Sequence, residues 1–377
     1  MISKNKIGVL YPQSAQYKTL SQDFIKGIKC NDLSVEYYME SISIGSDEKI
    51  IIERIQKLQY QHDVNIIIGF FGHHKIEDVY QYAADNELIL IATGLGATLP
   101  YSQAKYKGVY INSYALNESC YLLGKYLIES GYSNIVSSTS YYDAGYGLLS
   151  SIETSLLEND LTFSGHYITP FMPRENEAAL MEQSIDNNGT DAVFAFHSGL
   201  YAKEHAGFIA QTELLHKFDY YIIPFTLNKD IFKGKNKNIY VVSSWLEEGE
   251  EEKHSAFSKA YNQENNKYPT VFTLLGYESG LILKEVLQNV ESTSYEDVVN
   301  EINNVEISGP RGMLKFDESC NRTIFNHYIY KPIAYDENNF SFEKVETLNN
   351  NGHFIKKILS TPTPDRIGGW HNAYLCH

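Results

Sequence analysis

Apolar and polar positions alternate between two periods along the first two thirds of the chain. The short apolar run "KIGVLY" at residues 6–11 precedes the amphipathic segment "SQDFIKGIK" at 21–29. Further on, Ile51, Ile55 and Leu58 recur at helical spacing before the buried-strand pattern "VNIIIGF". Strand patterns that alternate with helix patterns are typical of β-α-β units around a parallel sheet. The pattern therefore predicts an α/β fold.

The same order of elements occurs twice. Strand-like segments that begin at Lys6, Ser34 and Val64 recur, each 128 residues later, at Asn134, Thr162 and Ala192. A period of this size predicts two similar structural units rather than a short solenoid repeat. We expect two similar Rossmann-like lobes with parallel sheets.

A third section, residues 250–330, belongs to neither repeat, and it contains two helical patterns and the strand-like "TIFNHYIYK". We expect this section to complete the first lobe. Lobe 1 would then comprise residues 1–114 plus 245–331, and lobe 2 residues 115–244 plus 332–377. Three crossings, near Ser113, Ser243 and Lys331, would form a hinge.

Charge and apolar run length exclude some classes of partner. The 377 residues contain 31 Lys and Arg against 47 Asp and Glu, and the resulting net charge of −16 argues against binding to nucleic acid. No apolar run approaches the ~20 residues that span a bilayer, so we expect a protein that is not membrane-inserted. The N-terminal residues leave no room for a signal peptide. We expect a cytoplasmic protein if the chain is complete as given, and a periplasmic one if a leader was removed.

Several motifs with chemical meaning are weak here. Cys30, Cys120, Cys320 and Cys376 show no metal-like spacing, so free thiols are expected, with one disulfide as the alternative. The segment "GLGATL" lacks the third glycine of a dinucleotide fingerprint. The acidic run "EEGEEE" near residue 250 is interpreted as a solvated face. We predict no cofactor and no metal site.

Five segments together carry a family resemblance: "KIGVLYPQSAQYKTLSQDFIKGIK", "VNIIIGFFGHHKIEDVYQYAADNELILIATGLGATLP", "YYDAGYG", "FTLLGYESGLIL" and "GPRGMLKFD". In their order and spacing they resemble type I periplasmic binding proteins, nearest to the branched-chain amino-acid-binding group that serves ABC importers, with bacterial amide sensors as relatives. The resemblance covers residues 6–331. It implies two lobes joined by a three-crossover hinge, which close on a small ligand without chemistry.

Candidate ligand-binding residues of the first lobe follow its strands, because ligands of open α/β sheets bind beyond the carboxyl ends of the strands. In "GFFGHHK", Gly72 exposes backbone N–H groups, Phe71 can wall a pocket, and His73 stands where the resembled family commonly has a ligand-contacting serine. An alternative is that His73 and His74 only cap the following helix. The candidates at the other two strand ends are Ser14, Tyr17, Thr93, Gly94 and Thr98, of which Thr98 matches the family's ligand-binding threonine.

The second lobe and the third section supply the other candidates. Tyr141, Tyr146, Ser198 and Tyr201 follow strand-like segments, and Tyr146 matches the family's ligand-stacking tyrosine, although packing alone is the alternative for each tyrosine. Glu278 either binds a ligand ammonium group or only stabilises a helix start.

These observations favour reversible binding of a small polar metabolite. An amino acid is the first candidate, and an amide or a short carboxylic acid the next. The partner would be an ABC permease, or a regulator protein if the chain is a cytoplasmic amide or amino-acid sensor. No nucleophile elbow, P-loop or pair of catalytic carboxylates favours an enzyme. A lobe pair used only for protein interaction is a third interpretation.

Overall fold

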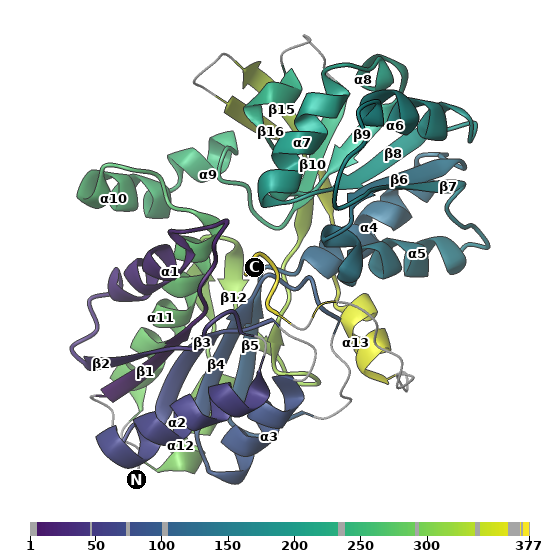
Figure 1. Cartoon of the computed structure of the whole chain (residues 1–377). Coiled ribbons are helices and arrows are strands. Elements are labelled where there is room, and N and C mark those ends of the chain that lie inside the picture. The colour runs from purple at the N-terminus through teal and green to yellow at the C-terminus, as the bar shows by residue number, and fades with distance from the viewer. Residues whose placement is uncertain are drawn as a thin grey trace. The chain divides into compact units, whose positions relative to one another are not determined.

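The computed structural model describes residues 6–45, 47–72, 76–99, 105–232, 238–290, 294–335, 340–360, 370 and 372–376 (Figure 1). Its residues form two compact units. Unit 1 comprises Met1–Ala115, Ser255–Phe325 and Asn351–His377, and unit 2 comprises Leu116–His254 and Asn326–Asn350. The chain therefore passes from one unit to the other four times, once more than the sequence predicts.

Unit 1 is built on a seven-stranded sheet with the order β13-β14-β5-β4-β3-β1-β2, and a two-stranded ribbon, β11-β12, accompanies it. The elements of unit 1 are β1 (Lys6–Tyr11), α1 (Leu20–Lys29), β2 (Glu36–Ser41), α2 (Glu48–His62), β3 (Ile66–Phe70), α3 (Ile76–Asp85), β4 (Ile89–Gly94), β5 (Val109–Ser113), α10 (Ala256–Asn265), α11 (Val271–Asn289), α12 (Tyr295–Asn303), β11 (Ile307–Gly309), β12 (Gly312–Leu314), β13 (Phe316–Asp317), β14 (Arg322–Thr323) and α13 (His353–Ser360).

Unit 2 is built on a second seven-stranded sheet, with the order β16-β15-β10-β9-β8-β6-β7. The elements of unit 2 are α4 (Leu116–Glu129), β6 (Ile135–Ser140), η1 (Asp143–Gly145), α5 (Leu148–Leu157), β7 (Gly165–Thr169), α6 (Glu177–Asp186), β8 (Ala192–Phe196), α7 (Gly199–Ile209), α8 (Leu214–Lys217), β9 (Asp219–Ile222), η2 (Pro224–Thr226), η3 (Lys229–Phe232), β10 (Ile239–Ser243), α9 (Glu250–His254), β15 (His327–Tyr335) and β16 (Phe340–Leu348).

The predicted repeat is confirmed by the strand order. Five parallel strands run β5-β4-β3-β1-β2 in unit 1 and β10-β9-β8-β6-β7 in unit 2, which is the same order in the same direction. In unit 1 the central strand β3 is buried along its whole length, as its isoleucine run predicts for a strand covered on both faces. The fold is a two-lobed α/β fold.

The helices of unit 1 show how the sequence forms this arrangement. Helix α2 begins at Asp47, whose side chain accepts hydrogen bonds from the N–H groups of Lys49 and Ile50, and it buries Ile51, Ile55 and Leu58. Two other helices approach each other closely through glycine. A Cβ added at Gly27 of α1 would overlap the carbonyl oxygen of Thr273, and one at Gly276 of α11 would overlap that of Phe24. The third section therefore packs within unit 1.

The units divide the C-terminal region differently from the expected boundaries. Residues 351–377, which the sequence assigns to the second lobe, belong to unit 1, where Nζ of Lys356 on α13 donates a hydrogen bond to Oδ2 of Asp317 at 2.7 Å. Residues 245–254 and 326–331 belong to unit 2 rather than to the first lobe. There the hydroxyl of Tyr330 donates to Oε1 of Glu252 at 2.8 Å.

That contact also corrects the interpretation of the acidic run "EEGEEE" as a solvated face. The residue Glu252 is only 5% exposed, and its Oε1 also lies 2.8 Å from Nζ of Lys344. At least this carboxylate belongs to the packing of α9 against β16.

Candidate ligand-binding site

The strand-end face of unit 1 is the surface beyond the carboxyl ends of β1, β3 and β4. The loop after β1 contributes Ser14, and the loops after β3 and β4 are joined to each other by Thr98, whose hydroxyl donates to the carbonyl oxygen of Gly72 at 2.8 Å. Within the sheet, the hydroxyl of Thr93 donates to the carbonyl oxygen of Gly69 at 3.1 Å. Thr93 is buried, so it fixes the two strand ends, whereas Thr98 is half-buried.

Three candidates on this face make packing contacts that the sequence pattern does not show. The ring of Phe71 folds back over Gly69, is 3% exposed and belongs to the core of unit 1. Gly94 is glycine because a Cβ there would overlap the carbonyl oxygen of Phe71. Tyr17 is half-buried, with its ring edge-on to Phe272 at 6.0 Å. His73, with His74, lies outside the described residues.

The strand-end face of unit 1 is covered by a short stretch from the end of the chain. This 372–376 segment, Asn372 to Cys376, packs on Gly72, and its Leu375 carbonyl oxygen accepts a hydrogen bond from the hydroxyl of Ser14. Nothing in the sequence pattern predicts this, because the resemblance ends before the segment.

Glu278 has a role that differs from both sequence interpretations. Its carboxylate lies within unit 1, with no exposed side-chain surface, and pairs with the guanidinium of Arg311, whose Nη2 is 2.5 Å from Oε2. Nδ2 of Asn112 donates to the same oxygen at 3.1 Å. Because these donors are themselves buried, the carboxylate balances Arg311 and is not presented to a ligand ammonium group.

Arg311 ties this ion pair to the places where the chain leaves unit 1. Its Nη1 donates to the carbonyl oxygen of Ser113 at 2.8 Å, two residues before the first crossing, and its guanidinium carbon lies 4.0 Å from the ring centroid of Phe325, the last residue before the third crossing. This arginine stands in the motif "GPRGMLKFD", whose pattern does not show the ion pair. Its place in the turn between Gly309 and Gly312 was the available signal.

The strand-end face of unit 2 is organised by a buried carboxylate, that of Asp143. Its Oδ2 accepts hydrogen bonds from the Ser140 hydroxyl at 2.5 Å and from the N–H of Ser198 at 3.1 Å, and its Oδ1 accepts one from the Ser198 hydroxyl at 2.7 Å. Ser198 is the residue before α7, so the negative charge sits at a helix N-terminus, where the helix dipole stabilises it. The Ser198 hydroxyl therefore orders the loops.

The tyrosines of unit 2 lie around this carboxylate. The hydroxyls of Tyr142 and Tyr146 are 2.8 Å apart, and the ring of Tyr142 stacks on that of Tyr201 with centroids 6.0 Å apart. Burial raises the pKa of Tyr201, with smaller contributions from the charges of Glu204 and Asp143. Thus the structure brings together three of the four candidates of this unit: Tyr146, Ser198 and Tyr201.

Tyr141, the fourth, is 48% exposed, with its ring edge-on to Phe171 at 6.1 Å. Phe171 is itself 65% exposed. The strand ends of unit 2 therefore expose two aromatic rings, whereas the hydroxyls of Ser14 and Thr98 at the strand ends of unit 1 donate to carbonyl oxygens of the same unit.

The sequence of residues 4–334 matches the family described as periplasmic binding protein, which is 331 of the 377 residues. The chain belongs to this family. The type I resemblance given by its sequence motifs is thereby confirmed.

Solved structures share the fold of this periplasmic binding protein at low sequence identity. A solute-binding protein of an ABC transporter from R. palustris, in complex with benzoate, has 18% identity and a TM-score of 0.72 over 92% of this chain and 96% of its own. A substrate-binding protein from Sphaerobacter thermophilus has 16% identity and a TM-score of 0.76, over 92% and 98%. A leucine-binding protein from Thermotoga maritima has 14% identity and a TM-score of 0.64, over 92% of this chain and 99% of its own. A comparison with curated protein sequences found no match.

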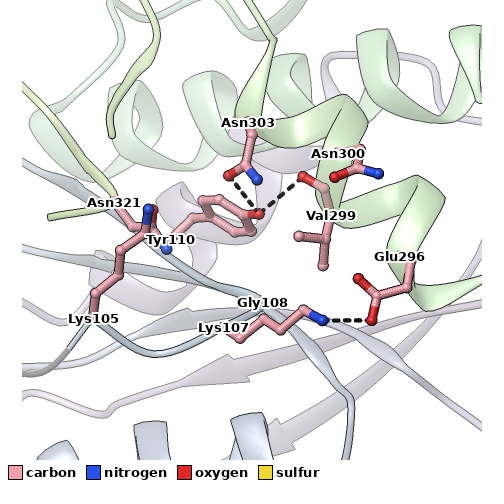
Figure 2. Close-up of a pocket in the computed structure, with 9 residues that line it drawn as sticks. All are labelled: Lys105, Lys107, Gly108, Tyr110, Glu296, Val299, Asn300, Asn303 and Asn321. Atoms are coloured by element: carbon pink, nitrogen blue, oxygen red, sulfur yellow. Dashed lines mark hydrogen bonds and ion pairs between the residues drawn. The ribbon is translucent and has the colours of Figure 1, made fainter. Parts of the chain in front are cut away.

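A pocket of about 290 Å³ lies elsewhere on unit 1, at the amino end of β5 (Figure 2). The hydroxyl of Tyr110 donates to the carbonyl oxygen of Val299 at 3.1 Å and to Oδ1 of Asn303 at 3.0 Å, and Lys107 pairs with Glu296. These contacts join α12 to β5. The pocket is therefore a packing feature of that joint, at the opposite end of β5 from the strand-end face.

In the described part of the chain, no group of three or more His, Cys, Asp or Glu side chains is placed to hold a metal ion. Likewise, none of the helices there has the length and apolar character needed to cross a membrane. All four cysteines are free thiols, and Cys120, Cys320 and Cys376 are buried.

Proposed function

We propose that this periplasmic binding protein reversibly binds a small polar metabolite, as the substrate-binding component of an ABC importer. The observation that carries the proposal is the family membership over residues 4–334, joined to two sheets of the same strand order with polar and aromatic side chains at their carboxyl ends. Such strand ends are where open α/β sheets bind ligands. Hinge closure would add contacts from the second unit, and the ligand shifts that equilibrium by its higher affinity for the closed form.

The ligand class that we favour is a small carboxylate. An amino acid is the first candidate and an aromatic or short carboxylic acid the second, because the structural neighbours include a leucine-binding protein and a protein in complex with benzoate. The hydroxyls of Ser14 and Thr98 each have one proton, which would turn from its present carbonyl acceptor to a carboxylate ligand. A tyrosine such as Tyr146 suits an apolar or aromatic ligand body. A neutral amide is the remaining alternative from the resemblance.

Thermal shift with defined probes tests this proposal. L-leucine, benzoate, 4-hydroxybenzoate and acetamide are each titrated into the purified chain, and we expect at least one carboxylate to raise the melting temperature. A ligand at 100 times its Kd stabilises the folded state by about 2.7 kcal/mol, which raises the melting temperature by a few degrees.

Two conservative substitutions then locate the site. Thr98→Val keeps the side-chain shape but removes the hydroxyl, and Tyr146→Phe keeps the ring but removes the bond to Tyr142. We expect Thr98→Val to weaken carboxylate binding about tenfold, since hydrogen bonds to charged groups contribute about 1.5 to 3 kcal/mol. Tyr60→Phe, on α2 and 72% exposed, is the control. Binding unchanged in both site variants would refute the site, and no response to any probe would count against the proposed ligand class.

A further inference from the structure

The 372–376 segment forms a compact turn that is folded into unit 1. The Cys376 N–H donates to the Ala373 carbonyl oxygen at 2.9 Å, and Nδ2 of Asn372 donates to the Cys376 carbonyl oxygen at 2.5 Å. From Ala373 to Cys376 no residue is more than 2% exposed. The segment is therefore buried as firmly as a core strand, although it lies more than 30 residues beyond the family match.

The segment fits between two glycines of unit 1. A Cβ added at Gly45 would lie 3.4 Å from the methyl carbon of Ala373, and one added at Gly72 would lie 3.6 Å from it. The N–H of Ala373 also donates to the carbonyl oxygen of Ile44 at 3.2 Å. The face thus receives a peptide backbone with one small side chain that is 0% exposed, so a charged side chain at 373 would be buried there.

A second observation points to a specific fit. Leu375 has a left-handed backbone, with φ of 71°, which residues other than glycine rarely adopt without support. Support comes from Ser14, whose hydroxyl donates to the Leu375 carbonyl oxygen while accepting a hydrogen bond from the N–H of Tyr17 at 2.9 Å. The Ser14 hydroxyl is thus already used by a peptide carbonyl.

We propose that the strand-end face of unit 1 is a peptide-binding surface that the chain's own 372–376 segment occupies, and that a small ligand binds there only by displacing it. The inference rests on the proposed function for its second half, because it takes the same face as the ligand site. Two positions that the sequence assigns to the ligand, Ser14 and Gly72, contact the segment, and Thr98 holds the Gly72 carbonyl. The apparent affinity for the ligand then equals the intrinsic affinity multiplied by the fraction of molecules in which the face is open.

The test compares four forms of the full chain. A deletion of residues 370–377 removes the segment. Ala373→Glu keeps its length but puts a charged side chain between Gly45 and Gly72, and Ala373→Gly is the matched control that still fits. Circular dichroism and thermal melting establish that each form is folded, and Ala373→Glu decides the matter if the deletion does not fold.

Two readouts separate this inference from the proposed function. A synthetic peptide of residues 370–377 should bind the deletion form at least tenfold more tightly than it binds the parent. L-leucine and benzoate, measured by calorimetry, should bind the deletion and Ala373→Glu forms at least tenfold more tightly than they bind the parent or Ala373→Gly. A folded deletion form that does not bind the peptide overturns the inference, as does equal affinity of the small probes for all four forms. If no small probe binds any form, the proposed ligand class fails while the peptide result still decides the occupant.

The thiol of Cys376 reports displacement directly. It is fully buried, and burial raises its pKa to about 12, so it reacts slowly while the segment is seated. In a Cys30→Ser background, a probe that displaces the segment should speed labelling of Cys376 by a maleimide at least fivefold, as measured by mass spectrometry of the C-terminal peptide. Unchanged labelling with a probe that binds would contradict displacement.

Discussion

Two histidines buried in unit 2 should make its stability fall as the pH falls. His197 follows β8 and His205 lies on α7, and their rings stack with centroids 3.8 Å apart. Burial lowers the pKa of His205 from its ordinary value of 6.5 to about 3. Burial also lowers the pKa of His197 well below 6.5, and the neighbouring His205 adds to that effect. Both rings are therefore neutral in the folded protein near pH 7.

The direction and size of the change in unfolding free energy with pH follow from the linkage between protonation and folding. Above pH 6.5 both states carry a neutral imidazole, so the full stability is present. Between pH 6.5 and 3 the unfolded chain binds a proton at His205 that the folded chain does not, and stability falls by about 1.4 kcal/mol per pH unit. From pH 6.5 to pH 5 the loss is about 2 kcal/mol for His205 alone. Below pH 3 no further loss comes from this residue.

His205→Phe tests this reasoning, since a phenyl ring can stack on His197 but cannot be protonated. The variant loses the hydrogen bond between the Tyr220 hydroxyl and Nε2 of His205, which is 3.0 Å long, and that cost is the same at each pH. Urea unfolding is followed by circular dichroism at pH 7, 6 and 5. We expect the parent to lose about 2 kcal/mol more than His205→Phe between pH 7 and 5.

A control fixes the interpretation of that difference. His254→Gln removes a histidine whose side chain is 63% exposed, and it should follow the parent at every pH. If His205→Phe and the parent lose the same free energy of unfolding between pH 7 and 5, the buried neutral imidazole is not the cause of the pH dependence.

Two further substitutions test the packing of unit 1. Gly27→Ala should lower the free energy of unfolding by about 1 to 3 kcal/mol or more in the urea assay, because the added Cβ overlaps a backbone oxygen of α11. The control Gly207→Ala on α7, with no atom within 4 Å of the added Cβ, should raise it by about 0.5 to 1 kcal/mol. Equal effects of the two substitutions would contradict the close helix contact. Arg311→Met should lower the free energy of unfolding by about 3 to 5 kcal/mol, because it leaves the Glu278 carboxylate buried without its cation. Adding Glu278→Leu in a double-mutant cycle should restore much of that free energy, and additive losses would show that the two residues are not coupled.

The fold was accessible from the sequence because it rests on periodicity. A buried parallel strand needs an apolar run such as residues 66–68, and an amphipathic helix needs apolar residues about every 3.6 positions. Both patterns can therefore be recognised in a single sequence. The internal repeat predicted two similar units, and the structure shows the same strand order in both sheets. Family membership followed from the same segments, taken in order.

The candidate site was less accessible, because neighbours in space rather than in sequence decide what a polar side chain does. Glu278 and Arg311 are 33 residues apart, and nothing in either local pattern shows that they form an ion pair. Ser198 was found by its place at a strand end, but the acceptor of its hydroxyl is Asp143, 55 residues away. The place of the Phe71 ring also depends on a neighbour, since the missing side chain at Gly69 leaves room for it in the core.

The segment at the end of the chain shows why composition and motif could not reveal it. Asn372 to Cys376 contains an alanine, a tyrosine, a leucine and a cysteine with no helical or strand period, so the pattern carries no prediction of burial. Its place is set by contacts with Gly45 and Gly72 and by the hydrogen bond from the Ser14 hydroxyl, which come from distant parts of the chain. These are features that also suit a surface for binding a ligand, since glycine exposes backbone groups and serine supplies a donor. A face that is shaped to receive a small polar molecule is, for the same physical reason, able to receive a turn of peptide.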